Sequence, residues 1–255
     1  MIKIYKYVLI DILKNRILLV YALLLFLMSF AVFSIEDTSA KGVLSMLNVV
    51  LMIVPLVSII FSTIYFYNSS EFIELLLAQP LKRKTIWLAF FGGIVSSLEI
   101  AFFLGAGIVT LFSSFSWTSV LLVITGMLLT GVFASIATLA AAYTRDKAKG
   151  IGAAIMLWLY FSVIFDGLLM FLLFQFSDYP IEHYMVGFSM LNPIDLSRIL
   201  ILMKLDVSAL MGYTGAIFRE FFGSVYGMII AFGVLLLWVI IPIMASLIKF
   251  KRKDI

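Results

Sequence analysis

The chain has 255 residues, of which 64% are hydrophobic and only 13% are charged. In a soluble domain about a quarter of all residues are charged, so this composition excludes an ordinary soluble enzyme and predicts a membrane protein. The formal net charge of +4 is modest and lies beside apolar segments, which indicates contact with a membrane surface and not with nucleic acid.

Six long apolar segments follow one another along the chain. A helix of about twenty apolar residues spans the hydrocarbon core of a bilayer. The first segment lacks a small-residue cleavage signature, so we expect a retained helix and not a removed signal peptide. The predicted spans cover residues 17–35, 47–67, 86–112, 119–143, 150–176 and 226–248. The expected fold is an all-α membrane protein in which residues 1–255 form a single transmembrane domain.

Residues 1–16 precede the first span and have the pattern of an amphipathic helix. Charged side chains at Lys3, Lys6, Asp11 and Lys14 share one face. We expect this segment to lie in the membrane interface, with a basic flank that only orients the first span as the alternative. The apolar face is made of Ile4, Tyr5, Val8, Leu9, Ile12 and Leu13.

Basic residues gather on alternate connectors. Most of the 18 lysines and arginines lie in the N-terminal segment, in the second and fourth connectors and in the tail. The positive-inside rule therefore places both termini in the cytoplasm. The predicted outer connectors are Glu36–Gly42, a short one near Ser113–Ser119 and a long one at residues 177–225. Their only basic residues are Lys41, Arg198, Lys204 and Arg219.

The connector at residues 68–85 predicts a short helix. Glu71 and Glu74 lie near its start, where acidic side chains favour the positive end of a helix, and Pro80 ends it. Basic residues around Arg83 then lead into the third span. Such a helix between two spans is suited to docking in a groove of another protein, and the alternative is a surface helix that only turns the chain round.

Two carboxylates lie near the middle of predicted spans, Glu99 in the third and Asp166 in the fifth. Acids at this depth are costly, so they face the interior of a bundle or a wet cavity. The functional reading is a cation site, a proton site or a gating contact. The alternative is a structural hydrogen bond or a protonated buried acid. No lysine or arginine is expected at the same depth, so no ion pair within the chain is expected.

Small residues recur along the fourth span and permit close helix packing. We expect packing within the chain, with a dimer seam as the second possibility. The stripe consists of Gly126, Thr130, Ala134, Ala137, Thr138 and Ala141.

The long connector at residues 177–225 is still apolar. Asn192-Pro193-Ile194-Asp195 has the features of a helix start, with a capping side chain, a proline at the first position and an acid in the first turn. The helix is expected to continue to Leu205, and a second piece is expected from Ser208 to Phe222. We expect both pieces to lie on the outer membrane surface or to re-enter the membrane.

The chain offers little chemistry of its own. Cysteine is absent, and the single histidine, His183, with Met185 and Met190 nearby, is a weak copper site because most methionines in an apolar chain are packing residues. Gly187-Phe188-Ser189-Met190 matches a serine protease motif, but no span carries the histidine base. A phosphate-binding loop is also missing. We therefore expect no catalytic site, no metal and no cofactor in this chain.

One connector resembles a known family. Glu74-Leu75-Leu76-Leu77-Ala78-Gln79-Pro80-Leu81-Lys82-Arg83 is similar to the cytoplasmic segment of ABC-2 type permeases, as are the six spans and the re-entrant region. Leu191-Asn192-Pro193-Ile194-Asp195-Leu196-Ser197-Arg198 and Ala209-Leu210-Met211-Gly212-Tyr213-Thr214-Gly215-Ala216 resemble a narrower branch, the permease of the nitrous-oxide reductase maturation transporter.

This resemblance implies a homodimeric permease in a bacterial inner membrane, with two copies of a separate ABC ATPase that holds ATP and Mg. It also implies an extracytoplasmic partner and a mechanical role in delivering copper to the reductase. The implied ATPase-coupling residues are Glu71, Phe72, Glu74, Leu75, Leu76, Pro80 and Arg83. The implied contacts with the outer partner are Asn192, Pro193, Asp195 and Arg198.

Two other functions remain open at this point. The first is an ABC-2 exporter of a lipid, drug or peptide, whose ATPase a substrate would stimulate. The second is an ion-coupled secondary transporter that uses Glu99 and Asp166. The two halves of the sequence show no obvious inverted repeat, which weakens the secondary-transporter reading.

Overall fold

The computed structural model describes residues 2–36, 38–144, 146–176, 182–205, 222 and 224–252. Regular structure within these residues is helical, and no strand occurs among them. The predicted all-α fold with six spans is confirmed. The spans cover Arg16–Ile35, Ser39–Asn68, Arg83–Ser113, Trp117–Tyr143, Lys147–Gln175 and Val225–Phe250.

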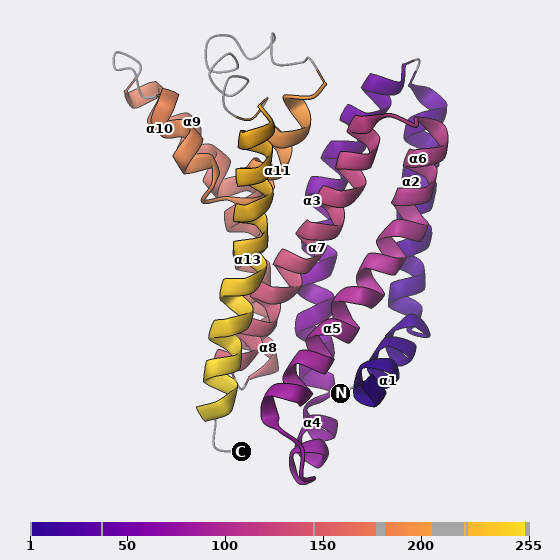
Figure 1. Cartoon of the computed structure of the whole chain (residues 1–255), viewed down its shortest axis with the longest axis vertical. Coiled ribbons are helices and arrows are strands. Elements are labelled where there is room, and N and C mark those ends of the chain that lie inside the picture. Colours follow the sequence, from indigo (N-terminus) through magenta and orange to yellow (C-terminus); the bar gives the residue numbers. More distant parts are fainter. Residues whose placement is uncertain are drawn as a thin grey trace.

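The helices follow the chain in an up-and-down order (Figure 1). The first four spans and their flanking helices are α1 (Ile2–Leu13), α2 (Arg16–Ile35), α3 (Ser39–Asn68), α4 (Ser70–Leu77), α5 (Arg83–Phe102), η1 (Phe103–Gly107), α6 (Ile108–Ser113) and α7 (Trp117–Tyr143). The rest of the described chain forms α8 (Lys147–Leu159), η2 (Tyr160–Ile164), α9 (Phe165–Gln175), α10 (Glu182–Ser189), α11 (Pro193–Leu202) and α13 (Val225–Arg252). The third and fifth spans each contain a π-helical segment, η1 and η2, which the sequence analysis did not predict.

The second span starts earlier than the sequence predicts. It begins at Ser39, because the Thr38 side chain caps the helix and its Oγ1 accepts a hydrogen bond from the Lys41 N–H at 3.4 Å. The hydropathy of this first turn is low, so a pattern based on apolar residues places the start of the span too late.

The fourth span, α7, is the central helix of the bundle. In its most apolar window, 78% of the residues are buried, and α7 packs against α3 on one side and α13 on another. Thr130, Ala134 and Ala137 of the small-residue stripe are fully buried. Since these contacts lie within one chain, the stripe serves intramolecular packing, as expected.

The N-terminal helix α1 packs against α5. Val8 and Ile12 are buried, and the Tyr5 hydroxyl donates a hydrogen bond to Ser96 Oγ at 3.0 Å. Lys3 and the other predicted charged positions of α1 are exposed. The predicted amphipathic pattern is therefore confirmed, and α5 covers the centre of its apolar face.

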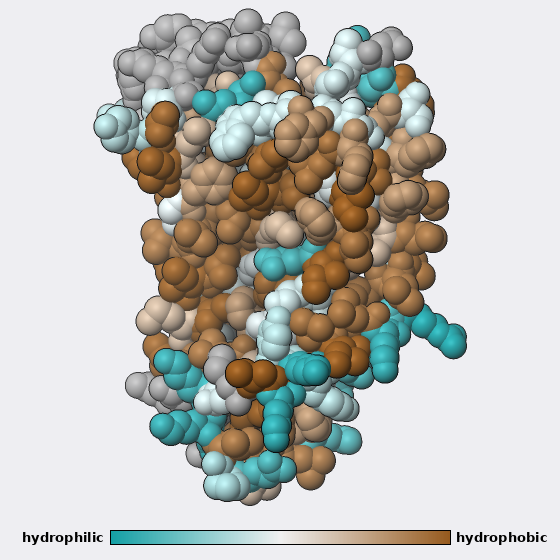
Figure 2. Space-filling view, turned by 45° about the vertical axis from the view of Figure 1, so that its right-hand side comes forward, coloured by the Kyte–Doolittle hydropathy of each residue, from teal (hydrophilic) through white to brown (hydrophobic). Residues whose placement is uncertain are grey.

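The surface of the molecule has the polarity of a membrane protein. Figure 2 shows a broad apolar band, with hydrophilic side chains gathered toward the end that holds both termini. We call this the basic end, after its exposed residues Lys3, Lys6, Lys82, Lys84, Lys147 and Lys149. At the opposite end, large aromatic side chains project outward, as at a membrane–water interface. They include Phe112, Phe115, Trp117 and Phe174.

A close contact between η1 and α2 gives a direct test of the packing. A Cβ at Gly105 would lie 2.6 Å from the Ala22 carbonyl oxygen and 2.9 Å from Leu25 Cβ. Because a backbone atom cannot move aside cheaply, Gly105→Ala is expected to destabilise the chain by about 1–3 kcal/mol. Gly152→Ala is the matched control, since no atom lies within 4 Å of its added Cβ. Thermal unfolding in detergent measures both, and equal melting temperatures would contradict the η1–α2 contact.

Candidate functional site

The short helix α4 lies at the basic end, between α3 and α5 (Figure 1). Its inner face is apolar: Ile73 and Leu76 are buried, and the Phe72 ring lies 5.9 Å from the Phe90 ring of α5 and 5.1 Å from the Tyr7 ring of α1. The helix ends at Leu77, before Pro80, as predicted. Phe72 and Leu76 therefore anchor α4 to the membrane domain.

The other face of α4 is exposed. Glu71, Glu74 and Ala78 are exposed, and the Leu75 side chain between the two acids is 67% exposed. Residues three and four apart share a helix face, so these four positions form one stripe. We call this stripe, Glu71, Glu74, Leu75 and Ala78, the α4 stripe. Pro80 and Arg83 lie beside it and are also exposed.

A set of contacts that the sequence analysis missed connects the base of α4 to the loop between α7 and α8. The Tyr67 hydroxyl lies 2.6 Å from Thr144 Oγ1, and Lys147 Nζ donates a hydrogen bond to Asn68 Oδ1 at 2.7 Å. The Tyr67 ring packs on Gly150, where any Cβ would collide with the Tyr67 hydroxyl. The end of α3, directly before α4, is therefore joined to the start of the fifth span.

Glu99 lies on α5, four residues before the π-helical segment η1. Its side chain is half-buried. Among the described residues, no hydrogen bond or ion pair to the Glu99 carboxylate is present. The structural hydrogen bond that the sequence analysis gave as one alternative is therefore not formed by Glu99 among the described residues.

Asp166 has a different environment, and here one expectation was wrong. Arg198 Nη1 donates to Asp166 Oδ2 at 2.8 Å and to Asp195 Oδ1 at 3.0 Å. An ion pair within the chain therefore exists. It forms because α11 folds into the bundle and carries Arg198 to the fifth span.

A fourth side chain completes this group. Asn192 Nδ2 donates to Asp195 Oδ2 at 3.1 Å and to the Phe161 carbonyl of η2 at 2.8 Å. We call the four side chains Asp166, Asn192, Asp195 and Arg198 the clasp, because they fasten α11 to the fifth span. Burial raises the pKa of Asp195 to about 7, and the neighbouring Asp166 charge acts in the same direction. Arg198 and the Asn192 hydrogen bond oppose this rise.

The helix α11 starts as the sequence predicts. Asn192 Oδ1 accepts a hydrogen bond from the Ile194 N–H at 3.0 Å, Pro193 is at the first turn, and Asp195 follows. The helix then packs against α3, α7 and α13 and is almost wholly buried. Asn192, Pro193 and Asp195, which the sequence analysis linked to an outer partner, thus face the interior of this chain. The exposed large side chains nearby are Tyr184, Phe188 and Leu191.

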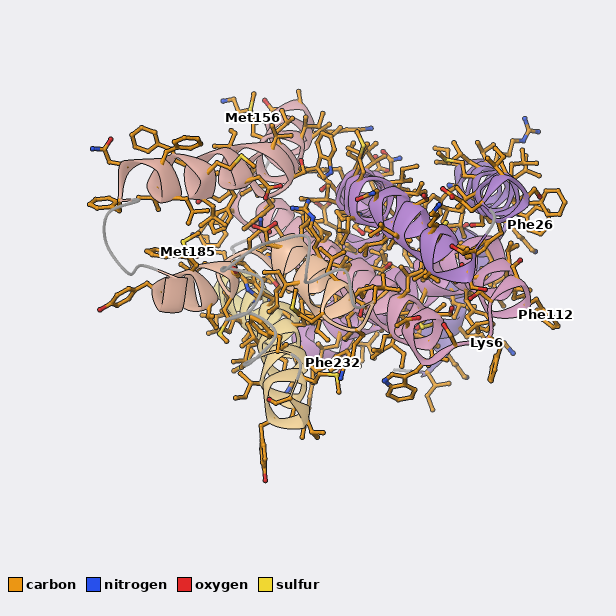
Figure 3. The ribbon with its side chains drawn as sticks, turned by 90° about the horizontal axis from the view of Figure 1, so that it is seen from above. Lys6, Phe26, Phe112, Met156, Met185 and Phe232 are labelled. Carbon is orange, nitrogen blue, oxygen red and sulfur yellow. The ribbon has the colours of Figure 1, made fainter. Side chains whose placement is uncertain are left out.

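An apolar cluster surrounds α11 at the end opposite the basic end. Figure 3 views the chain from this end, with Met185 on α10 and Phe232 on α13. Met185 is buried in this cluster and Phe232 packs against it, so Met185 is a packing residue. Ser189, from the rejected protease motif, is buried and donates to the Met185 carbonyl at 2.8 Å.

The next feature is whether side chains gather into a possible metal site. No group of three or more His, Asp or Glu side chains within them is arranged to hold a metal ion. The side chain of His183 lies outside the described part of the chain, as do residues 206–221, which include the predicted piece after Ser208 and the segment Ala209–Ala216.

Comparison with known protein families matches residues 2–255 to the family described as ABC-2 family transporter protein. The match includes α4, the clasp and all six spans. A search of curated proteins gives no significant match.

Proposed function

The chain belongs to the ABC-2 family of transporters, and on that premise we propose that α4 is the coupling helix through which a separate ABC ATPase drives this permease subunit. The observation that supports this role is the α4 stripe. It presents two acids and an exposed leucine on a helix whose opposite face is fixed to the bundle. An amphipathic helix of this kind fits the groove of a partner protein.

The orientation follows from charge. The basic end carries exposed lysines on α1, on the α4–α5 connector and at the start of α8. The positive-inside rule places this end, with both termini and α4, in the cytoplasm of a bacterial inner membrane. The clasp and the exposed aromatic side chains Phe112, Phe115, Trp117 and Phe174 then face the extracytoplasmic side.

The assembly that we propose contains two copies of this chain and two ATPase subunits, which hold ATP and Mg. The exposure of the fifth and sixth spans supports the presence of a second copy. Only 11% and 17% of the residues in their most apolar stretches are buried within one chain. Lipid or a neighbouring copy must cover the remaining apolar faces. The coupling surface would include Glu71, Phe72, Glu74, Leu75, Leu76, Pro80 and Arg83, with Phe72 and Leu76 as anchors.

As the biological role of this transporter, we propose maturation of the copper sites of nitrous-oxide reductase through an extracytoplasmic partner. The support is the similarity of Leu191–Arg198 and Ala209–Ala216 to that branch of the family. Exposed Tyr184, Phe188 and Leu191 offer an apolar contact surface next to α11. The task would be mechanical: movements of the helices driven by the ATPase would be relayed to the extracytoplasmic partner.

Gentle detergent purification followed by mass spectrometric identification of bound proteins tests this proposal. The expected result is an ABC ATPase together with an extracytoplasmic protein. Recovery of the ATPase alone, with ATP hydrolysis stimulated by a lipid, drug or peptide, would replace the maturation role by export. Full transport activity of the chain without any ATPase would overturn the coupling role itself.

A further inference from the structure

The clasp holds one more negative group than positive groups. Asp166 and Asp195 share the single guanidinium of Arg198, at 2.8 Å and 3.0 Å. The Asp195 side chain is only 6% exposed, whereas those of Asp166 and Arg198 are each 34% exposed. Asp195 is therefore the most deeply buried charged group of the clasp.

One acceptor in the clasp has no donor. Asp166 Oδ1 is buried and makes no hydrogen bond to any described residue. Its other oxygen is bound by Arg198. A protonated Asp195 carboxyl can donate to an Asp166 oxygen, whereas an ionised Asp195 cannot.

No other described charge compensates this excess. The elements packed against α11 are α3, α7, α10, α13 and η2. Lys204 follows α11 in the chain, and α10 begins with Glu182 and His183, whose side chains are outside the described residues. The charges that act on Asp195 are those of Asp166 and Arg198. The other described titratable side chains on the packed elements are Lys41, Tyr65, Tyr67, Tyr143, Tyr160, Tyr184, Tyr226 and Lys249, and none of them is bonded to the clasp.

We propose that the clasp is a proton-operated latch: a proton on Asp195 closes it, and loss of that proton loosens α11 from the fifth span. With the proton, two carboxyl groups and one guanidinium carry no net charge and can satisfy one another. Without it, a buried excess of negative charge remains, and burial makes this charge costly. The latch goes beyond the proposed coupling role, because it concerns how the opposite end of the permease responds to the pH of its own compartment.

The direction of the pH effect follows from Asp195. Its pKa is raised by burial from an ordinary value of 3.8 to about 7, so the folded chain binds a proton that the unfolded chain releases. Stability from this group is therefore fully present at acid pH and is lost as the pH rises through about 7. The latch is closed on the acid side and loosened on the alkaline side.

The distance between α9 and α11 tests the latch directly. The chain has no cysteine, so spin labels on cysteines introduced at Met170 and Leu191, both exposed, are unique. Pulsed electron paramagnetic resonance on the purified full chain is expected to give a narrow distance distribution at about pH 5.5 and a broader one at about pH 8.5. Identical distributions at both pH values would overturn the proposal.

Two variants assign the effect to the clasp. Asp195→Asn mimics the protonated side chain and is expected to keep the distribution narrow at both pH values. Asp166→Asn removes the competing carboxylate, so Asp195 pairs with Arg198 alone and the transition is expected to move to more acid pH. A merely structural role would broaden the distribution in these variants without moving the transition.

Two control variants separate the clasp from other titrating groups. Glu36→Gln changes a carboxylate at the same end of the bundle, bonded to Ser45 at 2.7 Å, and is expected to leave the transition unchanged. His183→Gln removes the only histidine, the side-chain type whose ordinary pKa lies closest to this pH range. A transition that disappears in His183→Gln and persists in Asp195→Asn would overturn the latch. The measurement needs no ATPase, so its failure is distinct from a failure of the proposed coupling role.

Discussion

Replacing Arg198 by methionine is expected to lower the melting temperature of the purified chain by roughly 5–10 °C. The change removes the only described cation of the clasp and leaves Asp166 and Asp195 facing each other without compensation. Breaking a fully buried ion pair costs about 3–5 kcal/mol, and partial exposure of Arg198 reduces this to about 2–3 kcal/mol. A thermal unfolding scan in detergent at neutral pH measures the loss.

The controls separate the clasp from a general loss of packing. Lys41→Met removes an exposed cation at the same end and is expected to leave the melting temperature unchanged. The triple variant Arg198→Met, Asp166→Asn, Asp195→Asn removes all the charges together, and we expect it to recover most of the loss. A single Arg198→Met variant as stable as the parent chain would show that the pair does not hold α11.

Glu74→Arg is expected to uncouple ATP hydrolysis from the permease. Glu74 lies in the α4 stripe, is exposed and forms no ion pair with another described residue, so reversal of its charge alters the docking surface while the membrane fold persists. A reversed charge at an interface leaves a partner charge unpaired, and we expect the ATPase affinity to fall on the order of tenfold or more. Co-purification yield and the ATPase activity of the reconstituted complex give the two readouts.

The matched control for this variant is Glu36→Arg, a charge reversal at the opposite end of the bundle. It should leave the bound ATPase and its activity unchanged. Unchanged melting temperature of Glu74→Arg would confirm an intact fold. Normal ATPase coupling in an intact Glu74→Arg variant would remove α4 from the coupling role.

The sequence predicts those features that depend on neighbouring residues. Long apolar runs identify six spans, and an asparagine followed by proline and aspartate identifies the start of α11. The α4 helix follows from its acids and from Pro80 in the same way. These signals are local, because helix length, capping and termination are set within a few residues.

The features that escaped prediction depend on residues far apart in the chain. Arg198 and Asp166 are separated by 32 positions, and Tyr67 and Thr144 by 77. The sequence predicts that Arg198 lies in an outer connector, because charge and hydropathy describe only the residues next to it in the chain. They do not show how deeply α11 inserts into the bundle. The close approach of Tyr67 and Gly150 likewise has no sequence signal beyond a glycine near the start of a span.

The π-helical segments η1 and η2 have a consequence for how the protein moves. Each lies within a span, and η2 offers the Phe161 carbonyl to the Asn192 amide at 2.8 Å. A wide turn interrupts the regular ladder of backbone hydrogen bonds, so bending there sacrifices fewer of them than bending elsewhere. The two parts of the fifth span on either side of η2, which are α8 and α9, can consequently tilt through unequal angles. A displacement applied at the basic end would then reach the opposite end with a changed direction as well as a changed amplitude.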